Sequence, residues 1–170
     1  YLYWWNSEGD TIRTRFMKSD STAVEGSHGT RQLVALSDGG FLHCGWCSDP
    51  INTGCITRLD STGTILWEKL YTNTNTINNA TQLEDGGFVL GGTRNGNLDK
   101  AVVIRTDSLG VVQWTRYHGV YASTTTGHRC LVDQDGTIRM PGSWNPSPGW
   151  SDNDSWACLF EYDDGGSLVG

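Results

Sequence analysis

The sequence predicts an all-β protein built from a repeated four-stranded unit of about 50 residues. The main evidence is internal repetition. SDGGFLHCG, which begins at Ser37, returns as EDGGFVLGG at Glu84, and CITRLDSTGTILWEKLY at Cys55 returns as VVIRTDSLGVVQWTRYH at Val102, in each case 47 residues later. In addition, no stretch shows the i, i+3, i+4, i+7 apolar spacing of a good helix. Two elements that share one offset indicate an internal duplication.

The composition agrees with many short strands joined by turns. Hydrophobic residues are 36% and charged residues 18% of the 170 residues, and the 22 glycines are more useful at turns than inside helices. The net charge is −7 and no run of Lys or Arg occurs, which argues against nucleic acid as a partner. No apolar stretch approaches the roughly 20 residues that span a membrane, so no membrane span is expected.

Each unit is predicted to contain two hairpins. QLVALSDGGFLHCGW places two apolar runs around Asp-Gly-Gly, which is a hairpin signal. CITRLDSTGTILWEKLY places two more around Asp-Ser-Thr-Gly, where Gly can adopt positive φ. Four antiparallel strands in a unit of this length are typical of one blade of a β-propeller, because a single blade cannot bury both of its faces alone.

The repeats divide the chain into about three and a half blades. We expect the end of an incomplete blade over 1–28, complete blades over 29–75 and 76–122, and a blade over 123–170 that has a loop insert and is truncated at its last strand. Propellers close with roughly four to eight blades. These units are therefore expected to form part of a larger ring, with further blades of the same chain as neighbours.

The third and the first copies diverge from the middle ones. The third begins with QDGTIRMPG at Gln134, where Thr137 replaces the second Gly, and continues with CLFEYDDGGSLVG at Cys158. The N-terminal YLYWWNSEGDTIRTRF matches the second hairpin, with Asn6 in place of the Asp and Arg13 in place of the Trp.

Residues that recur once per unit are predicted to be structural, since catalytic residues usually occur once. The recurring carboxylates are expected in turns, where Asp bonds backbone N–H groups, and the recurring tryptophans are expected between blades. Apolar strand residues are expected on the covered faces: Phe41, Leu42, Ile56 and Leu66, with their counterparts Phe88, Val89, Val103 and Gln113, of which Gln113 is the one polar exception. The recurring set is Asp38, Asp85, Asp60, Asp107, Trp67 and Trp114.

This pattern resembles the bacterial DGG[FY]-type β-propeller repeats of large secreted or surface proteins. The resemblance covers nearly the whole chain and is best from Asp38 to Trp67 and from Asp85 to Trp114. It implies a propeller fold, an extracellular or cell-surface location and often a separate sorting domain. It implies no single catalytic activity, so neither catalytic residues nor a cofactor are carried over.

A second resemblance concerns a shorter segment. RLDSTGTILW is similar to the tryptophan-docking motif of quinoprotein-type propellers, although its Asp-to-Thr spacing is one residue shorter. That resemblance implies a structural Trp and no quinone or calcium chemistry. The Asp boxes of sialidases match less well, because the Asp-to-Gly spacing differs and no arginine triad can be assigned.

The five cysteines leave two interpretations open. They are Cys44, Cys47, Cys55, Cys130 and Cys158, so at least one thiol is unpaired within the chain. The CGWC spacing is typical of redox motifs, but no helix follows it. A local disulfide between Cys47 and Cys55 is one interpretation, and buried thiols that act as small apolar residues are the other.

Ligand binding is expected in the segment that does not repeat, PGSWNPSPGWSDNDSW. Exposed Trp beside Asn and Asp suits sugar stacking or a protein hot spot. Two carboxylates are too few for a Ca²⁺ site, so no metal site is predicted. The alternative is a decorated loop with a hydrophobic plug. The candidate residues are Trp144, Trp150, Trp156, Asp152 and Asp154.

The expected function is a non-enzymatic binding or scaffold module of an exported or cell-surface protein, which contacts a protein or a glycan at a loop face. The four His are scattered, and no GxSxG, HExxH or phosphate loop occurs. The alternative is part of a polysaccharide-active propeller enzyme whose catalytic residues lie outside this segment. A structural block of a virion or filament is a third interpretation.

Overall fold

The structure is a computed structural model in which every regular element of the described residues is a β-strand. Its sheets are antiparallel and three of them have four strands, which confirms the all-β class and the four-stranded unit. The propeller arrangement itself stays a prediction. The described residues are 2–15, 28–49, 51–94, 100–118, 124–127, 129–145 and 156–170.

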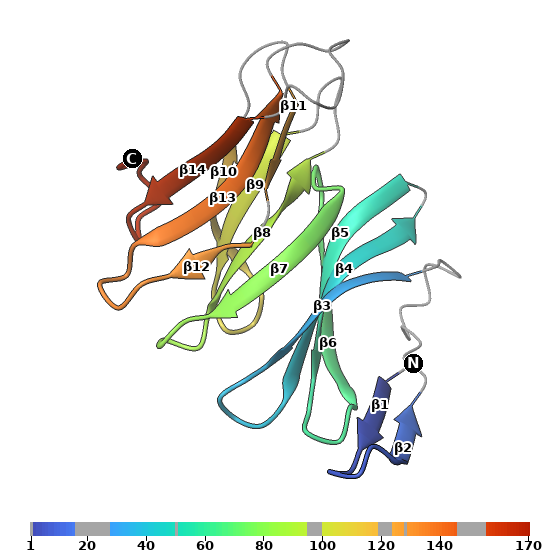
Figure 1. The fold of residues 1–170 in the computed structure, drawn as a ribbon. Coiled ribbons are helices and arrows are strands. Elements are labelled where there is room, and N and C mark those ends of the chain that lie inside the picture. Colours follow the sequence, from blue (N-terminus) through green and yellow to red (C-terminus); the bar gives the residue numbers. More distant parts are fainter. Residues whose placement is uncertain are drawn as a thin grey trace.

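The strands follow one another along the chain as one hairpin and three sheets (Figure 1). The hairpin pairs β1 (Leu2–Trp5) with β2 (Thr11–Arg15). The first sheet contains β3 (His28–Ala35), β4 (Phe41–Asp49), β5 (Ile51–Leu59) and β6 (Ile65–Tyr71). The second contains β7 (Thr76–Gln82), β8 (Phe88–Arg94), β9 (Lys100–Thr106) and β10 (Val112–His118). The third contains β11 (Thr124–Gly127), β12 (Leu131–Val132), β13 (Ile138–Asn145) and β14 (Trp156–Tyr162).

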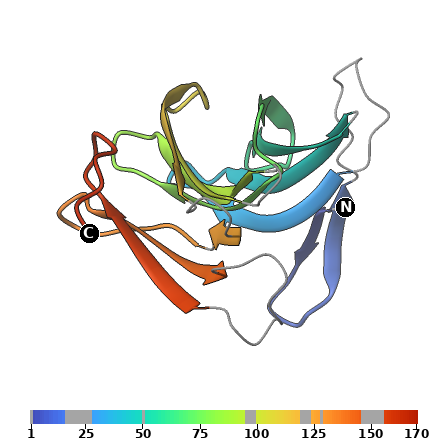
Figure 2. The same ribbon diagram turned by 90° about the horizontal axis from the view of Figure 1, so that it is seen from above.

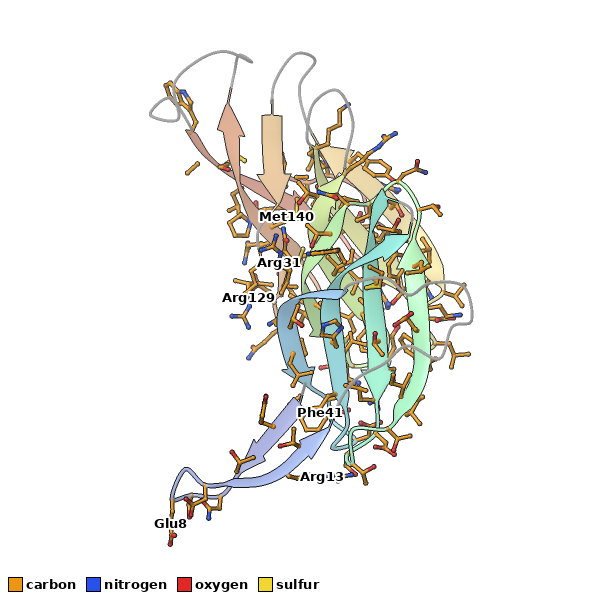
Figure 3. All side chains as sticks on the ribbon, turned by 90° about the vertical axis from the view of Figure 1, so that its right-hand side faces the viewer. Glu8, Arg13, Arg31, Phe41, Arg129 and Met140 are labelled. Atoms are coloured by element: carbon orange, nitrogen blue, oxygen red, sulfur yellow. A yellow bond between two sulfur atoms is a disulfide. The ribbon has the colours of Figure 1, made fainter. Side chains whose placement is uncertain are left out.

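Successive sheets pack face to face in an arc that does not close. Strand β7 of the second sheet lies against β3, β4 and β5, and β11 of the third sheet lies against β8 and β9. Seen from above, the hairpin and the three sheets follow the arc in chain order, with the hairpin in dark blue at one end and the third sheet in orange and red at the other (Figure 2). Glu8 marks the tip of the hairpin, away from the sheets (Figure 3).

The second sheet is buried on both faces because its central strands are apolar at successive positions. Side chains on one face join a cluster with the first sheet, and those on the other face join a cluster with the third. The first-sheet side presents Phe88, Leu90, Val102 and Ile104. The third-sheet side presents Val89, Ala101 and Val103.

The repeated tryptophans lie at these two contacts between sheets. Trp67 packs edge-on against Phe88, with ring centroids 6.4 Å apart, and Trp114 packs against Tyr162 at 6.3 Å. Leu66, which the sequence placed on a covered face, is 56% exposed, so that prediction is wrong. Leu66 lies on β6 and its counterpart Gln113 on β10, which are edge strands, and the described residues leave both side chains exposed, whereas the apolar side chains of the central strands are buried.

The tight turns use one hydrogen-bonding scheme at each repeat. In the first kind of turn, the N–H of Gly40 and that of Gly87 donate to the carboxylates of Asp38 and Asp85 at 3.0 and 2.9 Å. The glycine that directly follows the Asp in each of these turns has a φ of 83°, 82° and 83° in the three sheets, a conformation that glycine adopts without strain. The three are Gly39, Gly86 and Gly136.

The second glycine of Asp-Gly-Gly makes room for a buried arginine. A Cβ at Gly87 would overlap the guanidinium of Arg105 and the carbonyl oxygen of Thr106. Arg105 is buried there and pairs with Asp85, and Arg58 repeats this arrangement in the first sheet. In the third sheet both members change together, because Thr137 takes the glycine place and Glu161 takes the arginine place.

Replacing Gly87 by alanine is therefore expected to lower the free energy of unfolding by about 1–3 kcal/mol, because the added methyl group overpacks the arginine site. Urea denaturation measures this change. Thr137→Gly is the matched control and is expected to cost only about 0.5–1 kcal/mol of backbone entropy. Equal effects of the two substitutions would mean that the arginine does not require the glycine.

Candidate functional site

The two ends of the sheets differ in how much they repeat. Antiparallel register places the repeated Asp-containing turns at one end of each sheet and the connections from β4 to β5, from β8 to β9 and from β13 to β14 at the other. At this second end, called here the variable end, the strands terminate at different residue types in each sheet. The two strands that each of these connections joins end and begin here at Asp49 and Ile51, at Arg94 and Lys100, and at Asn145 and Trp156. The variable end is where the units stop resembling each other.

Two of the predicted ligand-binding tryptophans meet at the variable end of the third sheet. Trp144 of β13 and Trp156 of β14 are direct backbone partners, and the side chain of Trp156 is 63% exposed. Only the backbone of Trp144 is described. The other predicted residues, Trp150, Asp152 and Asp154, lie outside the described residues.

A second aromatic group at the variable end was missed from the sequence. The guanidinium of Arg94, at the end of β8, lies 4.8 Å from the centre of the Tyr117 ring on β10. Strand β9 runs between these two strands, so the pair forms only when the sheet assembles. Tyr117 is 38% exposed. A flat ring held by a cation is a suitable contact surface for a planar or ring-shaped ligand group.

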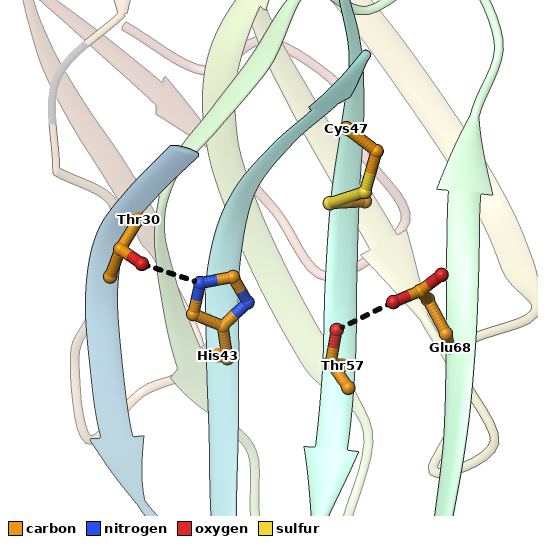
Figure 4. Close-up of a disulfide and its surroundings, with 6 residues drawn as sticks. Thr30, His43, Cys47, Thr57 and Glu68 are labelled. Carbon is orange, nitrogen blue, oxygen red and sulfur yellow. Dashed lines mark hydrogen bonds between the residues drawn. A yellow bond between two sulfur atoms is a disulfide. The ribbon is translucent and has the colours of Figure 1, made fainter. Parts of the chain in front are cut away.

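The face of the first sheet that is turned away from the second is polar (Figure 4). The imidazole Nε2 of His43 lies 3.0 Å from the hydroxyl of Thr30, and the hydroxyl of Thr57 donates to Glu68 at 3.1 Å. At the places of His43 and Thr57, the second sheet has Leu90 and Ile104. His43 and Thr57 are nonetheless buried, with 4% and 1% exposure.

A disulfide between Cys47 and Cys55 lies on the same polar face (Figure 4). It joins β4 to β5 across a Cα separation of 6.1 Å, so the disulfide interpretation holds for this pair. The buried-thiol interpretation holds for Cys44 and Cys130, whose side chains lie in the two apolar clusters. Burial raises the pKa of both thiols to about 12, so they are protonated and unreactive at neutral pH.

The repeated carboxylates accept hydrogen bonds within their own turns. The hydroxyl of Thr62 and the N–H of Thr64 bind Asp60 and lower its pKa to about 2. The N–H of Gly87, followed by Arg105, lowers the pKa of Asp85 in the same sense. These groups are ionised throughout the neutral range, which suits turn stabilisation and makes them poor general acids.

Few groups for other chemistry gather in the described parts of the chain. Within them no three His, Cys, Asp or Glu side chains come together as a metal ion would require, and no helix could cross a membrane. His118 packs on the ring of Phe160 at 4.5 Å, and burial lowers its pKa. No protein-family model matches the chain, and no curated protein matches its sequence. The DGG[FY] resemblance therefore stays a prediction from the sequence.

Proposed function

We propose that this chain is a non-enzymatic binding or scaffold module of an exported protein, and that a protein or a glycan binds at its variable end. The carrying observation is the exposed ring of Trp156 at this end, where the repeat breaks down. Repeated turns serve the scaffold, whereas non-repeating surface beside a rigid scaffold is free to carry binding groups. Trp156 and the Arg94–Tyr117 pair supply flat apolar surfaces with polar edges.

We infer further that the sheets are propeller-type blades. The same contacts recur between successive sheets, as is expected of blades related by one rotation. Trp67 lies against the turn glycine Gly110 of the next sheet, and Trp114 lies against Gly166 in the same way. The arrangement of the sheets in an arc also supports this proposal (Figure 2).

The disulfide supports export. Disulfides persist in oxidising compartments and are rare in the cytosol. Cys47 and Cys55 have no cysteine counterparts in the second sheet, where Arg94 and Val102 stand at the same places. The bond is therefore an addition to the repeat, at the strand ends near the variable end, and an extracellular or cell-surface location fits it.

Trp156→Ala is expected to weaken binding of the best glycan on a polysaccharide array at least tenfold, because it removes the exposed ring on which a sugar stacks. The array and a titration of the best glycan measure this loss. Tyr3→Ala is the matched control, since Tyr3 is a 48% exposed aromatic on the distant hairpin. Glycan binding that survives Trp156→Ala would place the site elsewhere, and release of reducing sugar from the bound polysaccharide would contradict a non-enzymatic role.

A further inference from the structure

The outer face of the third sheet departs from the repeat at three positions. Where the first two sheets have Leu36 and Leu83, the third has Asp133, and where they have Leu42 and Val89, it has Arg139. Where the first two sheets have Arg58 and Arg105, the third has Glu161. These three residues, called here the ionic cluster, are Asp133, Arg139 and Glu161.

The ionic cluster is a connected set of charges. Nε of Arg139 donates to the Glu161 carboxylate at 2.5 Å, and its Nη1 pairs with Asp133. Arg139 and Glu161 are backbone partners on β13 and β14, so the pair spans the two strands. The three side chains are 39%, 38% and 29% exposed for Arg139, Asp133 and Glu161, whereas Val89 at the place of Arg139 is fully buried.

If another sheet packed on the outer face of the third sheet, as the third sheet packs on the second, the contact would be unfavourable. The existing contact buries Val89 and Val103 against Ile138 and Met140, which releases apolar surface from water. It also buries Arg105, but the carboxylates that pair with this arginine, Asp85 and Asp164, remain mostly exposed. The same contact on the third sheet would remove one arginine and two carboxylates from water, and charge pairing repays such a desolvation cost only in part. Leu131 and Leu159, each 52% exposed, flank the cluster and would otherwise attract an apolar partner.

At the other end of the arc the hairpin precedes the first sheet (Figure 2). The first sheet itself has His43 and Thr57 where the second sheet has Leu90 and Ile104, and both polar side chains are already buried. A second copy that continued the arc would therefore not offer the apolar face that the second sheet offers to the first.

We propose that the ionic cluster prevents a second copy of this chain from stacking on the third sheet, and so limits head-to-tail association through this face. Charged residues on a sheet surface are a common means of excluding unwanted neighbours. The cluster thereby determines which neighbour the third sheet accepts and excludes a further unit with an apolar face.

The test restores the residues of the second sheet in the variant D133L/T137G/R139V/E161R. The glycine change makes room for the guanidinium introduced at position 161, which Asp135 can then bind as Asp85 binds Arg105. Sedimentation velocity is expected to show the wild-type chain at its 18.7 kDa monomer mass and the variant as dimers and larger species at the same concentration. Circular dichroism checks that both are folded.

The controls distinguish association through this face from non-specific hydrophobic association. E84L/Q113L adds apolar side chains at two exposed positions outside the cluster and is expected to stay monomeric. If the fourfold variant does not fold, R139M/E161Q removes the facing charges at similar side-chain size and is expected to raise self-association. A folded variant that stays monomeric overturns the proposal. So does a wild-type chain that self-associates and is made monomeric by Leu131→Arg.

Discussion

Val89→Arg is expected to lower the free energy of unfolding by about 4 kcal/mol or more, because it places an unpaired charge in a fully buried site. Val89 lies in the cluster that joins the second and third sheets, beside Ile138 and Met140. In the third sheet Asp133 and Glu161 pair with Arg139. The second sheet has Leu83 and Arg105 at those two places, so an arginine at position 89 has no carboxylate partner from them. Urea denaturation followed by tryptophan fluorescence measures the effect.

The chain supplies its own matched control at the equivalent position. Arg139→Val introduces the residue of the second sheet at the exposed face of the third, and it is expected to change the free energy of unfolding by less than about 1 kcal/mol, since exposed ion pairs contribute little. The contrast tests whether burial, and not the strand position itself, sets the cost of the arginine. A Val89→Arg chain as stable as the Arg139→Val chain would show that the second and third sheets do not pack as described.

Asn79→Ala is expected to lower the free energy of unfolding by about 2–3 kcal/mol, because it leaves the buried N–H of Cys130 without its partner. The Cys130 carbonyl oxygen keeps a second donor, the hydroxyl of Thr81 at 2.9 Å. The Asn79 side chain, 3% exposed, accepts from the N–H of Cys130 at 2.9 Å and donates to its carbonyl oxygen at 3.1 Å. Those groups are outside the ladder of the third sheet, which is interrupted between Gly127 and Leu131 opposite Pro141. Proline has no N–H for the ladder, so the amide of Asn79 takes the role of a strand partner.

Gln32→Ala is the control for this prediction. Gln32 occupies the same place in the first sheet, where its side chain is half-buried and, among the described residues, accepts one bond, from the N–H of Ala80 at 3.0 Å. Its loss is expected to cost about 1 kcal/mol. Hydrogen exchange at the Cys130 amide gives an independent measurement, since exchange should accelerate in the Asn79→Ala chain. An unchanged rate there would contradict the assigned hydrogen bond.

The strands and turns were predictable because their causes are local. The Asp side chain at the second hairpin turn bonds N–H groups two and four residues ahead, as Asp60 does with Thr62 and Thr64. Asn6 makes the same bonds in the N-terminal hairpin, which explains why it can stand at an Asp position. The continuous apolar runs of β8 and β9 likewise fit strands that are buried on both faces.

The candidate site was predictable only in part. Trp156 is exposed, as was expected of a Trp in the non-repeating segment, and its role in binding stays a prediction. The Arg94–Tyr117 pair left no signal in the sequence because a third strand separates its members. Leu66 was misplaced because an edge strand repeats the sequence pattern of a covered strand without a neighbour to cover it. The pattern alone does not distinguish these two cases.

The sequence by itself determined the class of the fold, the number of hairpins per unit and the places of the turns, because these depend on residues a few positions apart. The tertiary structure decided which faces meet, which cysteines pair and which charges remain in water. Those outcomes depend on side chains from different strands or from different units, such as Asn79 and Cys130, which come together only after the sheets have packed. The repeated residues therefore predict the strands and turns of each unit. The contacts of each unit with its neighbours decide whether the residues that differ between units are buried, paired or exposed.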